Sequence, residues 1–226
     1  MKKVKKHFDD VASGFDTRIL KSVPFYMDML EVLVLALPFN RNQKIKIADL
    51  GCGTGTISKM IKEHYPDALI TCVDFAGNMV QVAKNKLKGY GGINYVICDC
   101  RNFDFSPGYD AILSSLTLHH IRDNNEKRVF YKKIFKGLNN NGVFYAADLI
   151  LGSSDYLQNL NLEKWNEFLL KSLSQEEILK RKKIYEEEDH PFRLMDELSW
   201  LKDAGFCNVD VIWKYYFFTV YGGQKG

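Results

Sequence analysis

Residues 45–55 read Ile-Lys-Ile-Ala-Asp-Leu-Gly-Cys-Gly-Thr-Gly, an apolar strand pattern that runs directly into a glycine-rich loop. An amphipathic stretch, residues 54–65, follows at once and predicts a helix that begins where the glycines end. Glycine permits a sharp turn with positive φ and lets a ligand approach the backbone closely. The free N–H groups of a helix N-terminus suit an anionic or electron-rich ligand. The stretch therefore predicts a nucleotide-type ligand at the end of a first strand.

The chain beyond this loop alternates between strand and helix patterns. Apolar runs separated by amphipathic helices are typical of a parallel sheet covered on both faces. After a further helix, closed by Gly205, only a tight connection joins the last two strands, so these two must be antiparallel. We expect an α/β fold, a three-layer Rossmann-like sandwich whose seven-stranded, mostly parallel sheet ends in an antiparallel C-terminal hairpin. The expected strands are residues 45–50, 69–73, 93–97, 109–115, 142–150, 209–214 and 216–221, with helices at 77–88, 124–138 and 195–204.

Two segments interrupt or precede this pattern. Residues 1–40 predict one or two helices that form an N-terminal lid segment over the ligand. Residues 153–190 predict helices only, one of them opened by a capping box at Ser174 and Glu177, and are expected to form a helical cap insert. The ligand-binding domain is then made of residues 41–152 and 191–226.

The spacing of the glycines separates two classes of nucleotide ligand. The dinucleotide fingerprint G-x-G-x-x-G requires a glycine at position 56, where this chain has Thr56. Asp49 lies immediately before the loop, and its carboxylate would repel a pyrophosphate but favours the ammonium and sulfonium groups of S-adenosylmethionine (SAM). Asp49, Gly51, Cys52 and Gly53 are therefore predicted to bind SAM as the cofactor.

Acidic residues also end the second and third predicted strands. Asp74 is expected to accept hydrogen bonds from the ribose hydroxyls, as acids at this position do in dinucleotide sites. Phe75 and Met79 are expected to stack on the adenine ring. Cys100, next to Asp99 at the end of the third strand, is expected to offer backbone groups to the adenine edge. Ligands of open α/β sheets bind at the carboxyl ends of the strands, so these residues and the glycine loop predict one common site.

Several motifs resemble those of class I SAM-dependent methyltransferases. The sequence ADLGCGTG (48–55) is similar to the first motif of that family, and VDFAGNMVQVAKNKL (73–87) is similar to the second. YDAILSSLTLHHI (109–121) and LNNNGVFYAADLI (138–150) are similar to the fourth and fifth. The resemblance implies the fold and the SAM cofactor, and it leaves the acceptor open.

A narrower resemblance, over nearly the whole chain, is to the carboxy-SAM synthases of wobble-uridine tRNA modification. It is carried by LKSVPFY (20–26) and by the end of the terminal hairpin, YFF (216–218). It implies that Tyr26 contacts the cofactor, that Ser115 lies near its amino-acid part, and that Lys182 stands where the family has an arginine for the extra carboxylate. Lysine lacks the bidentate fork of arginine, and GCGTG is the ordinary methyltransferase loop, so we expect plain SAM.

Methyl transfer is an in-line displacement in which the cofactor supplies the reactive group and the protein aligns the acceptor. A base is needed only if the acceptor must lose a proton. His119, His120 and Asp148, near the ends of the fourth and fifth strands, are the candidate catalytic residues. We expect a SAM-dependent methyltransferase with a small-molecule acceptor. The alternatives are a carboxy-SAM synthase-like or tRNA-modification enzyme, and a non-catalytic SAM-binding module.

Composition argues against other classes of protein. The 31 basic and 28 acidic residues give a formal charge of +3, without the basic excess typical of nucleic-acid binders, so nucleic acid is not an expected partner. The five cysteines show no disulfide framework and no spacing for a metal site, so no metal is expected. No signal peptide or membrane-spanning stretch is recognisable. We expect a cytoplasmic monomer or homodimer.

Overall fold

A single twisted sheet of seven strands forms the centre of the computed structural model, which describes residues 2–106 and 108–226. The strand order is β3-β2-β1-β4-β5-β7-β6, in which β7 runs antiparallel to both of its neighbours and the other pairs are parallel. The expected fold class is confirmed. The strands are β1 Lys46–Leu50, β2 Leu69–Asp74, β3 Ile93–Ile97, β4 Tyr109–Ser115, β5 Leu138–Leu149, β6 Cys207–Tyr215 and β7 Phe218–Gln224.

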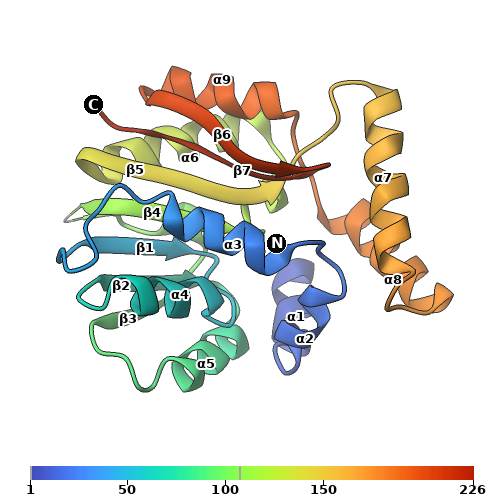
Figure 1. The fold of residues 1–226 in the computed structure, drawn as a ribbon, viewed down its shortest axis with the longest axis horizontal. Coiled ribbons are helices and arrows are strands. Elements are labelled where there is room, and N and C mark those ends of the chain that lie inside the picture. Colours follow the sequence, from blue (N-terminus) through green and yellow to red (C-terminus); the bar gives the residue numbers. More distant parts are fainter. Residues whose placement is uncertain (1, 107) are drawn as a thin grey trace.

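Helices cover both faces of the sheet (Figure 1). One face carries α3 (Tyr26–Leu35), α4 (Thr56–His64) and α5 (Gly77–Lys86), and the other carries α6 (Asn124–Gly137) and α9 (Leu194–Ala204). Between these layers the central strands bury aliphatic side chains completely, as expected for strands that are covered on both sides. This core fixes the carboxyl ends of β1, β2, β4 and β5 along one edge.

Several element boundaries differ from the sequence-based expectation, among them the start of β5 at Leu138 instead of Gly142, and two of these differences have a clear local reason. Helix α4 begins at Thr56 instead of Thr54, because Gly55 adopts a left-handed conformation with φ of 79°. The last strand begins at Phe218 instead of Tyr216, because Tyr216 has φ of 51° and belongs to the turn. An unbroken run of aromatic residues, 215–218, passes through this turn, so the sequence pattern did not reveal it.

Four further helices lie beyond the carboxyl ends of the strands (Figure 1). They are α1 (Lys2–Val11) and α2 (Phe15–Leu20), before the sheet, and α7 (Asp155–Leu169) and α8 (Gln175–Glu188), between β5 and α9. With α3, the N-terminal segment holds three helices, one more than expected, because Gly14 adopts φ of 77° and separates α1 from α2. The capping box that opens α8 is present.

Trp165 joins the two groups of outer helices. From α7 its indole Nε1–H donates a hydrogen bond of 2.8 Å to the carbonyl oxygen of Ser22, in the connection between α2 and α3. Its ring also packs edge-to-face on Phe217 in the terminal hairpin, with centroids 5.7 Å apart. One buried side chain therefore holds the N-terminal segment, α7 and the hairpin together.

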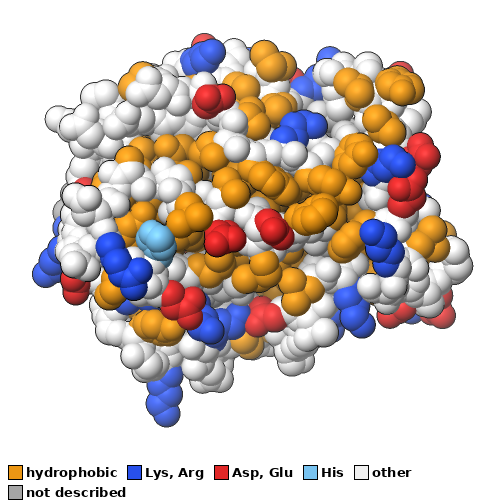
Figure 2. Space-filling model, in the orientation of Figure 1, with side chains coloured by type: hydrophobic (Ala, Val, Ile, Leu, Met, Phe, Trp, Pro, Cys, Tyr) orange, Lys and Arg blue, Asp and Glu red, His pale blue; other side chains and the backbone are white. Residues whose placement is uncertain are grey.

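Hydrophobic side chains are gathered across the face of the molecule on which α3 lies (Figure 2). Phe25, Met27 and Leu35 are exposed there. Single exposed apolar side chains are normal in folded proteins. No helix among the described residues is both long enough and apolar enough to span a bilayer.

A buried ion pair joins the two helices on the opposite face. Lys127 of α6 and Glu197 of α9 are almost completely buried and pair with each other. The second oxygen of Glu197 accepts a hydrogen bond of 2.5 Å from the hydroxyl of Tyr131, which lies 3.1 Å from the hydroxyl of Tyr221 on β7. Because every charge here has a partner, the network is stable only as a whole.

Replacing one member of this pair is expected to be costly. Lys127→Met should lower the free energy of unfolding by about 3–5 kcal/mol, because it leaves the carboxylate of Glu197 buried without its cation. Urea denaturation measures the loss. The double variant Lys127→Met/Glu197→Leu should recover most of it, whereas Lys164→Met, at an exposed pair, should change little. Equal losses in the single and double variants would contradict this account.

Candidate cofactor and substrate site

The glycine loop lies at the carboxyl end of β1 and is shaped by two close contacts. Gly51 has φ of 69°, and a Cβ atom at this position would overlap the side chain of Thr117, in the loop after β4. The backbone N–H of Gly53 donates a hydrogen bond of 2.9 Å to Oδ2 of Asp74 at the end of β2. The loop is thus held between β2 and β4, and only glycine fits at position 51 without a shift.

The two acids next to this loop differ in their surroundings. Asp74 also accepts a hydrogen bond of 2.8 Å from the N–H of Ala76, and burial raises the pKa of its carboxyl group. Asp49 is fully buried beneath the loop, where the hydroxyl of Ser58 donates to its Oδ2 over 2.7 Å. Burial raises the pKa of Asp49 to about 7, and its other oxygen has no partner. Asp49 is therefore placed behind the loop with one oxygen free.

A cleft runs along the loop and the carboxyl ends of the strands, and it brings together most of the predicted cofactor residues. Those that line it are Tyr26, Gly51, Cys52, Gly53, Asp74, Phe75, Met79 and Ser115. Asp99 and Cys100 line an adjoining recess, which shares Gly51, Asp74 and Phe75 with the cleft. The hydroxyl oxygen of Ser115 is buried without a partner, so a polar group is available inside the cleft.

The recess contains an ion pair that the sequence analysis did not foresee. Arg101 donates to both carboxylate oxygens of Asp99, over 2.9 Å from Nε and 2.5 Å from the terminal nitrogen. Burial opposes the charge on Asp99, but Arg101 outweighs it and lowers the pKa of the carboxyl group. Asp99 is therefore held ionised and fixed in place at the end of β3.

A second cavity, of about 280 Å³, adjoins the cleft on the side of the outer helices. Its walls are mainly apolar and come from α1, α2, α7, α8 and the terminal hairpin, with Trp165 and Phe217 among them. Arg18 and Arg181 bring positive charge to it. Both cavities share His120.

The structure places Lys182, the residue predicted to hold an extra carboxylate, outside this cavity. Arg181 lines the cavity, whereas Lys182 lines none of the cavities described above. Both residues lie on α8, and successive side chains on a helix point about 100° apart, so only one of them faces inward. The inward residue is the arginine, which offers the bidentate fork that lysine lacks.

Asp148, a predicted catalytic residue, lies outside both of these cavities. Its carboxylate is fully buried at the end of β5 and accepts hydrogen bonds from the N–H groups of Leu118 (2.9 Å), His119 (3.2 Å) and Leu149 (2.8 Å). It also pairs with Nδ1 of His119. Because its oxygens are occupied and it lines neither of these cavities, we propose that Asp148 positions the loop after β4.

The two histidines of this loop differ in protonation state at neutral pH. Burial alone would lower the pKa of His119, but the carboxylates of Asp148 and Asp189 outweigh it and raise that pKa to about 10. Burial, followed by the charge on His119, lowers the pKa of His120 to about 4. At neutral pH, His119 is a cation and His120 a neutral imidazole whose Nε2 has no partner. His119 is therefore unsuited to act as a general base.

Comparison with known proteins identifies the family of this chain. Residues 47–142 match the family model of a methyltransferase domain. A carboxy-S-adenosyl-L-methionine synthase of Campylobacter hominis is 32% identical over 98% of this chain and 96% of its own length. The chain belongs to the carboxy-SAM synthase family.

Solved structures match at the level of the fold. A putative O-methyltransferase of Nostoc punctiforme superposes with a TM-score of 0.69 at 17% identity, over 96% of this chain and 60% of that one. Phosphoethanolamine N-methyltransferase 2 of Haemonchus contortus, solved with SAM, gives a TM-score of 0.67 at 16% identity, over 90% of this chain and 43% of that one. The fold of this family member is thus the SAM-binding methyltransferase fold.

Sequence reasoning missed the residues that the outer helices bring to the site. Phe8 of α1 packs on Phe75 and on His120, with ring centroids 6.4 Å and 5.6 Å away. Arg18 and Asp189 line the second cavity. No motif marks these residues, because they reach the site through helix packing and not through a strand end.

Loss of the Asp74 carboxylate is expected to weaken cofactor binding in this carboxy-SAM synthase relative. Asp74→Ala should reduce SAM affinity at least about tenfold, because the variant loses an acceptor in the cleft and the bond that pins Gly53. Calorimetric titration with SAM measures the change. Asp203→Ala, on the exposed side of α9, is the matched control and should bind as the parent does. Unchanged affinity in Asp74→Ala would show that SAM does not use the end of β2.

The opposite pKa shifts of the two histidines predict a pH dependence. Because the pKa of His119 is raised, its protonation stabilises the fold. This stabilisation is fully present at pH values below 6.5, the ordinary pKa of histidine, and is lost as the pH rises towards 10. The lowered pKa of His120 makes protonation favour unfolding, so stability falls as the pH drops from 6.5 towards 4. Nitrogen-detected NMR at pH 7 should show a doubly protonated His119 and a neutral His120. Titration of both near pH 6.5 would contradict this result.

Proposed function

We propose that this protein is a carboxy-SAM synthase, which attaches a carboxyl group to the S-methyl carbon of SAM. The observation that carries the proposal is Arg181, which lines the cavity next to the predicted cofactor cleft. A guanidinium binds a carboxylate through two parallel hydrogen bonds, so it suits a cofactor that carries one more carboxylate than SAM. The full-length likeness to relatives named carboxy-SAM synthases supports the same function.

The transfer of a carboxyl group to the S-methyl carbon conserves atoms and electrons without a metal or a redox partner. A carboxylic acid donor releases carbon dioxide and keeps the electron pair of the broken carbon–carbon bond. That electron pair takes up a proton from the S-methyl group, whose acidity the positive sulfonium raises. The resulting methylene carbon attacks carbon dioxide and forms the S-carboxymethyl group. The donor itself receives the proton, so the protein only has to align the two molecules and exclude water.

The lining of the second cavity suits a donor molecule that has an apolar body and a carboxylate group. Apolar and aromatic side chains form most of its wall, and Arg18 and Arg181 supply positive charge beside the acids Glu188 and Asp189. Such a pocket, mainly apolar with a few charged groups, is typical of small-molecule sites. His120, neutral and shared by both cavities, lies where the donor and the methyl group would meet.

Methyl transfer to a small-molecule acceptor remains the second candidate. Its support is the loop Gly51-Cys52-Gly53-Thr54-Gly55, which has the ordinary methyltransferase form. In this reaction the methyl group would pass to a nucleophile in the same second cavity, and S-adenosylhomocysteine would be the product. The relatives favour the carboxy-SAM alternative over this expectation.

Binding of the two cofactor forms tests the role of Arg181. The parent protein should bind carboxy-SAM at least about tenfold more tightly than SAM, because only the former pairs with the guanidinium. Arg181→Met should abolish this preference, and Lys182→Met, its neighbour on α8, should retain it. Calorimetric titration measures both ligands. A parent protein without preference, or a preference that survives in Arg181→Met, would contradict the proposal.

A further inference from the structure

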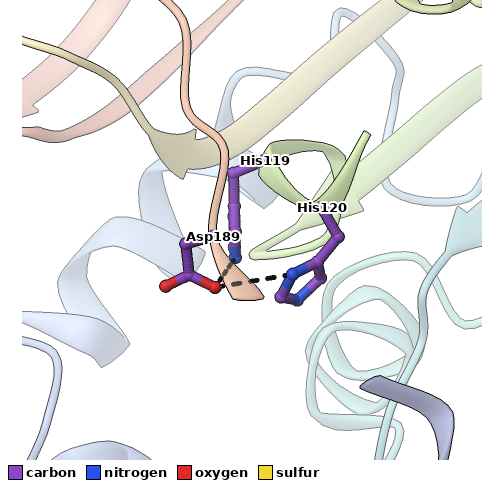
Figure 3. A group of neighbouring side chains, drawn as sticks. All are labelled: His119, His120 and Asp189. Atoms are coloured by element: carbon purple, nitrogen blue, oxygen red, sulfur yellow. Dashed lines mark ion pairs between the residues drawn. The ribbon is translucent and has the colours of Figure 1, made fainter. Parts of the chain in front are cut away.

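His119, His120 and Asp189 converge between the sheet and α8 (Figure 3). The histidines come from the loop after β4, and Asp189 follows the last residue of α8. One ligand atom from each side chain lies within 4.8 Å of the other two. Two imidazoles and a carboxylate, brought together from distant parts of the chain, are a typical ligand set for a divalent transition metal.

Two distances within this cluster, both from Asp189, match the separation expected between two ligands of one ion. Oδ1 of Asp189 lies 3.4 Å from Nε2 of His119 and 3.4 Å from Nδ1 of His120. A charge-assisted hydrogen bond between nitrogen and oxygen is shorter, about 2.7–2.9 Å. Two ligands that each lie about 2.0–2.1 Å from a tetrahedral zinc ion are separated by roughly 3.4 Å.

The residues around the cluster resemble those around known protein metal sites. Nδ1 of His119 is bonded to the buried carboxylate of Asp148, which leaves Nε2 to face Asp189. A carboxylate behind a ligating histidine fixes the ring and raises its basicity, as in many zinc sites. Asp148 and Asp189 together also supply two negative charges, which a divalent cation neutralises while His119 releases its proton.

His120 can coordinate without losing a bond at its other nitrogen. In the structure its Nδ1 lies 3.1 Å from the carbonyl oxygen of Glu188, and its Nε2 is buried without a partner. Coordination through Nδ1 moves the ring proton to Nε2, so the only bond given up is the one to Glu188. The ion replaces that bond with a stronger one.

We propose that His119, His120 and Asp189 form a binding site for one divalent transition-metal ion of the zinc class, with Asp148 as the orienting carboxylate behind His119. All three ligands line the second cavity. The fourth coordination position of the ion, which no protein atom fills, would therefore face the space for the second substrate. An ion there binds a carboxylate or enolate oxygen and orients it. This inference does not depend on whether a carboxyl or a methyl group is transferred.

Zinc binding to the full chain tests the site directly. The chelator-treated parent protein should bind one zinc ion per chain in equilibrium dialysis, read by elemental mass spectrometry. Asp189→Asn should bind zinc at least about tenfold more weakly, and Asp148→Asn about 10–100-fold more weakly, as is usual when the residue behind a ligand is lost. His190→Gln removes the adjacent histidine outside the cluster and should bind as the parent does.

Cobalt(II) provides a second readout that does not require activity. In the parent protein and in His190→Gln, it should give the strong visible absorption of a four-coordinate ion, and Asp189→Asn should lack that absorption. Circular dichroism verifies the fold of each variant, and Asp189, which is partly exposed, tolerates the change best. The proposal is overturned if the parent binds less than one zinc ion, or if Asp189→Asn binds zinc as tightly as the parent.

Discussion

The buried carboxylate of Asp148 is the constraint on which the site depends. A carboxylate removed from water costs several kcal/mol unless donors surround it. The loop after β4 surrounds this carboxylate, so that two backbone N–H groups and the ring of His119 all point at Asp148. The same wrapping places His120 at the boundary of both cavities and His119 against Asp189. An acid at the end of one strand thus determines the geometry of the neighbouring loop.

The sheet and the outer helices divide the site between them. Strand ends supply the cleft, where glycine, acid and aromatic residues are brought together by parallel topology alone. The outer helices α1, α2, α7 and α8 supply the second cavity and its cations. Because Trp165 ties α7 to the N-terminal segment and to the hairpin, these helices form one wall around the second cavity. A relative with the same sheet and different outer helices would keep the cofactor and change the second substrate.

Much of the fold and of the cleft follows from sequence, because each motif ends a strand and parallel strand ends share one edge. The glycine loop, Asp74 and Asp99 are found in this way. Arg181 is not, because two adjacent cations on α8 look alike until packing decides which one faces inward. The surroundings of Asp148 could not be predicted for a related reason. A sequence shows an acid near a strand end, but only the structure shows that backbone donors already occupy it.

We propose that the cleft and the second cavity together make and hold a carboxylated cofactor. Mass spectrometry of the nucleoside that remains bound to the purified parent protein tests this claim most directly. The account predicts a ligand heavier than SAM by the mass of carbon dioxide, which releases S-carboxymethyl fragments. SAM or S-adenosylhomocysteine as the sole bound nucleoside would contradict it.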